Sequence, residues 1–253
     1  MKILIICAGD RSNYSIALSA LKYLDKTNDN LTVCVLDKNK DLIRFLKKRK
    51  IKIIDQNIDN FFKSIKKDEF KWLLNIWGYK ILKREFLNKF ENNLNLHPSY
   101  LPFNRGRDPY YFSILNGTPF GVCIHRMDHT IDGGKYFLRE KFSLKFPVKA
   151  KDVFNISFKN IRELFIKNWV KIRNNKIKLK KFDKKNTKIN KRKELIKNNF
   201  LDLDNIKNKK ERTFILNCLA QDFDFLKIQL KIFNKIYDCE MNLNRAKKKN
   251  WKK

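Results

Sequence analysis

The sequence lacks the features that mark several classes of protein. Its five cysteines form no C-x-x-C pair, and their number is odd. A zinc site is therefore not expected, and buried free thiols of a cytosolic protein fit best. No apolar run approaches the length of a membrane-spanning helix, so we expect no membrane partner. The apolar run at residues 3–7 is too short for a signal peptide and is typical of a first strand.

Acidic residues are scarce beside basic ones. The chain has 58 Lys and Arg against 26 Asp and Glu, a net charge of +32. One interpretation is a nucleic-acid or anionic-membrane partner. The other is the codon bias of an AT-rich genome, which the Lys excess, the abundant Asn and the wide spread of charge favour. We therefore do not expect a nucleic-acid partner, although small anionic ligands would suit this surface.

The first part of the chain alternates short apolar runs with helical patterns. Strands are predicted at residues 3–7, 31–36, 51–54, 72–77 and 94–96, and helices at 13–24, 41–48 and 61–65. Strands separated by single helices predict right-handed βαβ units and a mostly parallel sheet. The fold class is therefore α/β, with a Rossmann-like core.

The rest of the chain changes in character twice. A Pro-rich loop precedes a short helix at 110–115, two strands at 121–127 and 136–144 joined by a Gly-rich turn, and a long helix at 153–172. Residues 171–200 then hold 13 Lys or Arg against 2 acidic residues, which indicates a linker or solvated extension. A helix at 210–219 and a hairpin within 226–242 are predicted beyond it. We expect a core at 1–174 and a small basic C-terminal region at 175–253.

Three polar residues carry the chemistry. Asn95 and His97 are two apart on one predicted strand, so both face the same side at its carboxyl end, where open α/β sheets bind ligands. Asp132 lies in a later turn. Together an Asn, a His and an Asp can perform acyl transfer by holding an oxyanion, moving a proton and orienting the imidazole. Each alone has a structural explanation, but the ordered set favours function.

This ordered set resembles the folate-dependent formyltransferase family, from residue 1 to about 170 and most sharply from 77 to 142. The resemblance implies that Asn95, His97 and Asp132 are catalytic and that 10-formyltetrahydrofolate is the donor, without a metal. It also implies a pterin pocket lined largely by backbone groups. Its residues would be Trp77, Gly78, Tyr79, Met127, Asp128, His129, Thr130 and Ile131. His125 is interpreted as structural.

The sequence indicates the acceptor of the formyl group less clearly than it indicates the reaction. The string Leu-Pro-Phe-Asn-Arg-Gly at 101–106 is most similar to that of the nucleotide-sugar enzymes of this family. The residues predicted to bind an amino sugar on a nucleotide diphosphate, with dTDP as the favoured nucleotide, are therefore Arg105, Gly106, Arg107 and Tyr110. The product would feed surface-polysaccharide, such as lipopolysaccharide, synthesis. A homodimer is a possibility.

Other acceptors remain open. Gly9 and Arg11 lie in a turn that resembles the phosphate loop of the glycinamide ribonucleotide enzymes, and a plain helix cap at Ser12 explains that turn equally well. The basic tail keeps methionyl-tRNA as an alternative. The formyltetrahydrofolate hydrolases share the Asn-His-Asp pattern, but their extra N-terminal domain is not expected here. An RNA- or partner-binding protein on the same fold is the non-enzyme alternative.

Overall fold

A computed structural model describes residues 1–8, 14–37, 39–54, 58–145, 148, 150–183, 188–194, 228–232 and 235–239. The chain divides into two compact units, Met1–Arg192 and Lys193–Lys253. The predicted helix at 210–219, and Gly9 and Arg11, lie outside the described residues. The predicted division at residues 174 and 175 stays a prediction.

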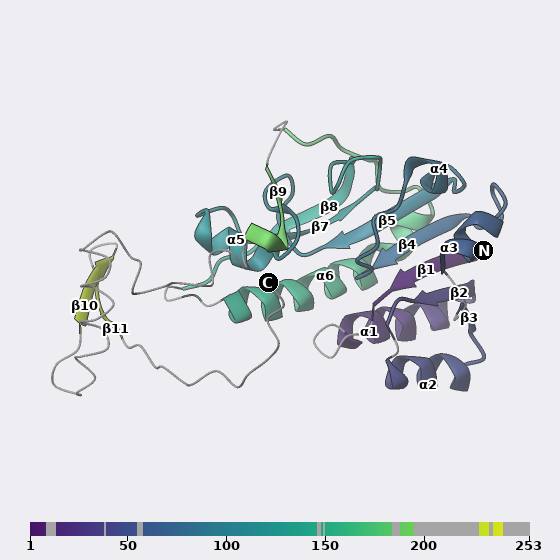
Figure 1. The fold of residues 1–253 in the computed structure, drawn as a ribbon, viewed down its shortest axis with the longest axis horizontal. Helices are drawn as coiled ribbons and strands as arrows, with labels where there is room; N and C mark the ends of the chain where they lie inside the picture. The colour runs from purple at the N-terminus through teal and green to yellow at the C-terminus, as the bar shows by residue number, and fades with distance from the viewer. Residues whose placement is uncertain are drawn as a thin grey trace. The chain divides into compact units, whose positions relative to one another are not determined.

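The first unit is built on a seven-stranded sheet of order β3-β2-β1-β4-β5-β7-β8 (Figure 1). Its strands are β1 (Lys2–Cys7), β2 (Asn30–Val35), β3 (Lys52–Ile54), β4 (Trp72–Ile76), β5 (Asn92–His97), β7 (Gly121–His125) and β8 (Tyr136–Lys141). The first five run parallel, whereas β5–β7 and β7–β8 are antiparallel. The mostly parallel α/β sheet predicted from the sequence is confirmed.

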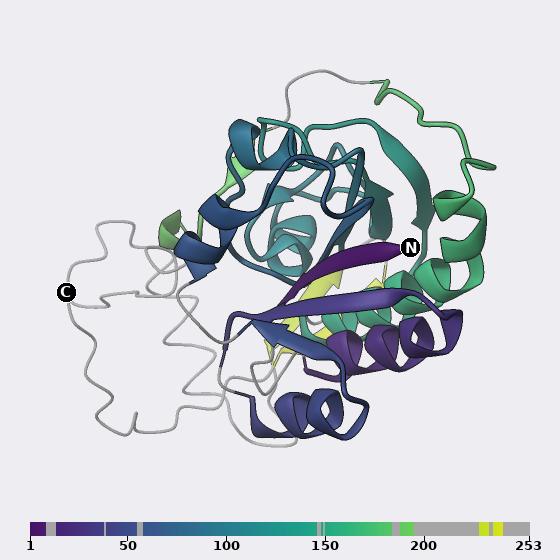
Figure 2. The ribbon, with the colours of Figure 1, turned by 90° about the vertical axis from the view of Figure 1, so that its right-hand side faces the viewer.

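Helices cover both faces of this sheet, as the two views show (Figures 1 and 2). On one face lie α1 (Tyr14–Leu24), α2 (Lys40–Lys48) and α6 (Ala150–Arg173). On the other lie α3 (Ile58–Ser64) and α4 (Arg84–Leu87). Alternate residues of β1 divide between the two cores: Ile3 and Ile5 pack with α1 and α6, and Leu4 and Ile6 pack with the Phe side chains of α3. This two-sided burial explains why β1 is apolar at every position from Ile3 on.

Several short elements were not expected from the sequence. A 3₁₀ turn, η1 (Asp25–Thr27), follows α1, and α4 follows β4. The strand β6 (Arg105–Gly106) pairs in parallel with β9 (Ile189–Asn190). β9 belongs to the basic segment that the sequence indicates to be a linker or solvated extension, so at least this part of the segment instead pairs with a strand of the first unit.

The remaining described elements are α5 (Pro109–Leu115) in the first unit and a hairpin in the second. In that hairpin β10 (Ile228–Ile232) pairs antiparallel with β11 (Lys235–Cys239). The hairpin predicted within residues 226–242 is therefore confirmed.

Candidate active site

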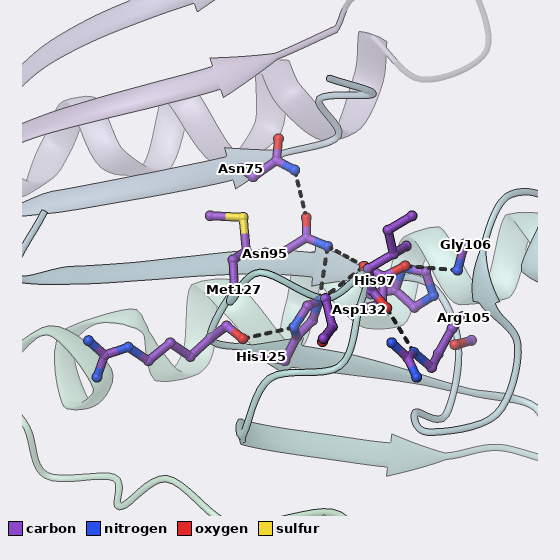
Figure 3. Close-up of polar contacts among 12 residues, drawn as sticks. Asn75, Asn95, His97, Arg105, Gly106, His125, Met127 and Asp132 are labelled. Atoms are coloured by element: carbon purple, nitrogen blue, oxygen red, sulfur yellow. Dashed lines mark hydrogen bonds and ion pairs between the residues drawn. The ribbon is translucent and has the colours of Figure 1, made fainter. Parts of the chain in front are cut away.

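Asn95 lies at the centre of the polar contacts at the carboxyl end of β5 (Figure 3). Its Oδ1 accepts a hydrogen bond from Asn75 Nδ2 at 3.0 Å. Its Nδ2 faces His125 Nε2 at 3.0 Å and donates to Asp132 Oδ1 at 3.3 Å. Asn75 Oδ1 in turn accepts from the Gly78 N–H at 3.0 Å, which fixes the orientation of both amides. The side chain of Asn95 is thereby held with its N–H groups toward Asp132.

His97 contacts an acceptor with each ring nitrogen. Nδ1 lies 3.6 Å from Asp132 Oδ2, and Nε2 lies 3.3 Å from the Asn104 carbonyl oxygen. Burial lowers the pKa of His97 below its ordinary value of 6.5, while the Asp132 carboxylate and the Asn104 carbonyl oppose this shift. The neutral imidazole is therefore favoured near neutral pH, with a carboxylate beside it that can stabilise the cation once a proton arrives.

Asp132 lies in a turn with a left-handed backbone, φ 48°. Its Oδ2 accepts from the Gly106 N–H at 2.9 Å, and its Oδ1 lies 3.4 Å from His125 Nε2. Burial on its own would raise the pKa of this carboxyl, but His97, His125 and the Gly106 N–H outweigh burial and hold the pKa below its ordinary value. Asp132 therefore stays a carboxylate, with its side chain 13% exposed, and the three residues predicted as one set do meet.

His125, which the sequence indicates to be structural, lies within this network. Its buried ring touches both Asn95 and Asp132. Its Nδ1 lies 3.2 Å from the Arg126 carbonyl oxygen, and its Nε2 faces both Asn95 Nδ2 and Asp132 Oδ1. The pairing of β5 with β7 brings His125 to the site, because its register sets Asn95 directly opposite His125.

Residues predicted to hold the pterin follow β4 and β7. Trp77 has φ 70°, and a Cβ on Gly78 would stand 2.3 Å from Asn75 Oδ1, so the backbone turns sharply next to the Asn95 network. Beyond it Tyr79 is 55% exposed and Ile81 is 72% exposed. On the facing loop Ile131 is 38% exposed. Exposed apolar side chains on two loops that flank Asn95 and Asp132 suit a flat ring, so these residues fit a folate donor.

The loop between β7 and Asp132 is ordered by its own polar groups. The Met127 N–H donates to Asn93 Oδ1 at 2.7 Å. Asp128 Oδ1 accepts from the Thr130 N–H at 2.8 Å and from its hydroxyl at 2.6 Å, while the His129 side chain is exposed. A Cβ on Gly134 would stand 1.9 Å from the Arg126 carbonyl oxygen, so this turn requires glycine. The loop therefore presents backbone beside Asp132, where the pterin is predicted.

Residues predicted to bind the acceptor divide into two groups. Arg105 Nε donates to the Ile131 carbonyl at 2.7 Å, so Arg105 and Gly106 support the Asp132 turn. The Arg107 side chain is exposed, and Tyr110 donates to Asp108 Oδ1 at 3.0 Å. Burial and the Asp108 carboxylate raise the pKa of Tyr110 to about 12, so it stays a neutral phenol.

Within the described ranges, no cluster of three or more His, Cys, Asp or Glu side chains is suited to hold a metal ion. Among the same residues, no helix combines the length and the apolar character that crossing a membrane requires.

The Asn-His-Asp set lies at the carboxyl edge of a mostly parallel sheet, where open α/β sheets bind ligands. Residues 1–153, more than half of the chain, match the family model described as formyl transferase. The chain belongs to this formyl transferase family, as its sequence motif predicts.

The chain resembles curated family members over part of their length. It is 33% identical over 152 residues to a methionyl-tRNA formyltransferase of Borreliella afzelii, a match that covers 53% of this chain and 47% of that one. The chain spans less than half of the length of the curated relatives that head the comparison.

Solved structures of similar fold include sugar enzymes. A 4-N formyltransferase from Francisella tularensis has a TM-score of 0.68 and 22% identity, with 97% of this chain and 98% of that chain covered. The N-formyltransferase from Helicobacter canadensis, in complex with folinic acid and dTDP-3-aminofucose, has a TM-score of 0.67 and 21% identity, with 84% and 79% covered. These likenesses establish the shared fold.

Proposed function

We propose that this chain transfers a formyl group from 10-formyltetrahydrofolate to the amine of a nucleotide-linked amino sugar, with dTDP as the favoured nucleotide. The observation that supports this proposal most directly is the convergence of Asn95, His97 and Asp132. The His97 ring lies 3.6 Å from Asp132, and Asn95 donates to the same carboxylate.

When bound, the folate supplies an activated formyl carbon, and this chain supplies the groups around it. The attacking amine must lose a proton as its bond to that carbon forms. His97 receives the proton, because its lowered pKa keeps it neutral and its side chain borders Asp132. Asp132 stabilises the resulting imidazolium, since the carboxylate stays charged. His97 then returns the proton to the folate nitrogen as the bond between that nitrogen and the formyl carbon breaks.

Asn95 meets the negative charge that develops on the formyl oxygen. Its amide is oriented by Asn75, so both N–H groups point into the site. The longer of its two contacts is the 3.3 Å hydrogen bond to Asp132 Oδ1, and the formyl oxygen replaces Asp132 as the acceptor of that N–H. A fixed donor of this kind costs no reorganisation during the reaction.

The nucleotide-sugar acceptor rests on different support from the chemistry. The Helicobacter canadensis structure holds folinic acid together with dTDP-3-aminofucose, and a sugar 3N-formyl transferase that is 25% identical over 80% of this chain was solved with dTDP. In this chain Arg107 and Tyr110 follow the catalytic strand and can meet a diphosphate and a sugar hydroxyl. Methionyl-tRNA is the second candidate, because the curated relatives carry that name.

An activity screen separates these acceptors. Purified chain and 10-formyltetrahydrofolate are incubated with dTDP-amino sugars, glycinamide ribonucleotide or Met-tRNA, and formylated product is measured by mass spectrometry. We expect product with a dTDP-amino sugar. Product with Met-tRNA alone would mean that Met-tRNA, and not a nucleotide sugar, is the acceptor. No product with any acceptor, in protein shown to bind folate, would contradict the proposed formyl transfer.

Binding measurements test the nucleotide on its own. We expect calorimetry to give a dTDP dissociation constant between about 1 µM and 1 mM, the usual range for enzyme substrates. Failure of dTDP, UDP and GDP alike to bind would exclude a nucleotide sugar. The role in surface-polysaccharide synthesis, the cytoplasmic location and the homodimer stay predictions.

A further inference from the structure

The strand β9 pairs with one edge of β6, and the candidate active site lies at the other edge. Arg105 pairs with Ile189 and Gly106 with Asn190, and the Arg107 N–H donates to the Asn190 carbonyl at 3.1 Å. Gly106 has φ 90°, and a Cβ there would stand 2.5 Å from that carbonyl oxygen. The two backbones are therefore in close contact, and residue 106 must be glycine for β9 to approach.

The opposite side of β6 holds the Asp132 turn. Arg105 Nε donates to the Ile131 carbonyl, and the Gly106 N–H donates to Asp132 Oδ2. The same two residues thus contact β9 on one side and the candidate catalytic carboxylate on the other (Figure 3 shows the second set of contacts). A displacement of β6 would change the position of Asp132 relative to His97.

Two residues beyond β9, Arg192 closes a second contact with the same loop. Its Nε lies 2.9 Å from Asp108 Oδ2 and its Nη2 lies 2.6 Å from Asp108 Oδ1. The Asp108 side chain is 5% exposed, and it also accepts from Tyr110. This forked pair is the geometry in which Arg recognises a carboxylate most specifically. Arg192 therefore fixes β9 next to β6 and fixes Tyr110 at the predicted acceptor side.

We propose that residues 189–192 are a positioning strap, which holds Asp132 against His97 through β6 and holds Tyr110 through Asp108. The strap rests on the proposed function, because it acts on residues with proposed catalytic and acceptor roles. Arg192 is a positioning residue, because it contacts Asp108 and its effect passes through Asp108 and β6.

The chain offers a readout that needs no acceptor. It has only three histidines, so their rings can be titrated individually by NMR. The groups that face His97 are Asp132, His125, Arg105 and the Asn104 carbonyl, and of these the Asp132 carboxylate and the carbonyl raise its pKa. If Asp132 moves away, the pKa of His97 must fall further. Asp132→Asn, which removes the charge outright, sets the full size of this effect.

The test compares Arg192→Leu with Lys181→Leu, an exposed Lys outside the strap that loses the same charge. We expect the His97 titration to move to lower pH in Arg192→Leu and to stay unchanged in Lys181→Leu. Arg192→Lys keeps the positive charge but cannot make both hydrogen bonds to the Asp108 carboxylate, so we expect a smaller shift of the His97 titration in the same direction. Because this variant keeps an ion pair with Asp108, it serves as the second test if Arg192→Leu folds poorly.

Formyl transfer is measured with the acceptor that the unaltered chain accepts in the screen. We expect kcat to fall between about tenfold and a hundredfold in Arg192→Leu, since misplacing a reacting group by about 1 Å can cost a hundredfold. A lower melting temperature with an unchanged His97 titration in both Arg192 variants would overturn the strap. Failure of every nucleotide sugar would instead remove the proposed acceptor and leave the NMR result standing.

Discussion

His97 is the residue whose loss we expect to cost the most activity. His97→Ala removes the group that takes the proton from the amine, so kcat should fall by at least about a hundredfold, the usual contribution of a general acid or base. Folate binding should persist, because the predicted pterin contacts lie on other loops. Stopped or steady-state assays give kcat, and calorimetry gives the folate affinity. Near-normal turnover would mean that another group moves the proton.

The pH dependence follows from the same side chain. The pKa of His97 lies below 6.5, and only the neutral ring accepts a proton. The rate should therefore rise with pH through the folded pKa of His97, which lies below 6.5, and become constant at higher pH. Measuring kcat/KM of the unaltered chain at a series of pH values from about 4.5 to about 8 tests this expectation. A limb centred well above 6.5 would contradict the lowered pKa.

His125 supports the site through hydrogen bonding. His125→Phe removes the ring nitrogen that contacts Asn95 and Asp132 in a buried place, and leaving a buried polar group without its partner costs about 1–3 kcal/mol of unfolding free energy. The exposed His129 serves as the control, because surface substitutions usually change stability by less than about 0.5 kcal/mol. Urea denaturation of His125→Phe and His129→Phe gives both values. Equal stability of the two variants would show that the His125 contact is not needed.

At the scale of elements, the turn after β4 determines where Asn95 points. A Cβ at residue 78 would meet Asn75 Oδ1 at 2.3 Å, so Gly78→Ala must displace Asn75 and with it the amide of Asn95. We expect kcat to fall by roughly tenfold or more, the effect of a misplaced catalytic group. Steady-state kinetics with saturating folate measure it.

Gly117 provides the matched glycine. A Cβ there meets nothing within 4 Å, but its φ is +59°. Gly117→Ala should therefore cost about 1–2 kcal/mol of stability, the penalty of the left-handed region, with kcat unchanged. If Gly78→Ala kept full kcat, or if both variants lost it equally, the turn after β4 would have no particular role.

The elements differ in how well the sequence predicts them. Asn95 and His97 could be placed because a two-residue spacing at the end of an apolar run needs only the strand period. The role of His125 could not, because it depends on the register between β5 and β7, which are separated by a long loop. The two-residue strand β9 could not be predicted either. It lies in a Lys-rich segment, and its single Ile is too short a pattern to show the alternation of apolar and polar residues that marks a strand.

At the scale of the whole molecule, the charge of +32 has a testable consequence. If it gives only non-specific attraction, tRNA binding should weaken by roughly a hundredfold or more between about 50 and 200 mM salt. Binding of dTDP involves two phosphates and should change far less. Fluorescence anisotropy with labelled tRNA and calorimetry with dTDP compare them. Tight and selective tRNA binding at physiological salt would favour methionyl-tRNA as the acceptor.

The strand order has a consequence for the nascent chain. The sheet grows outward from β1, first through β2 and β3 and then through β4, β5, β7 and β8, so the candidate catalytic residues join it late. The strap at residues 189–192 is translated later still. At about 5–20 residues per second, the ribosome needs roughly 10 to 40 s to reach residue 192. Until then the strand that carries Asn95 and His97 can join the sheet on the ribosome, while Asp132 still lacks the strand that pairs with β6.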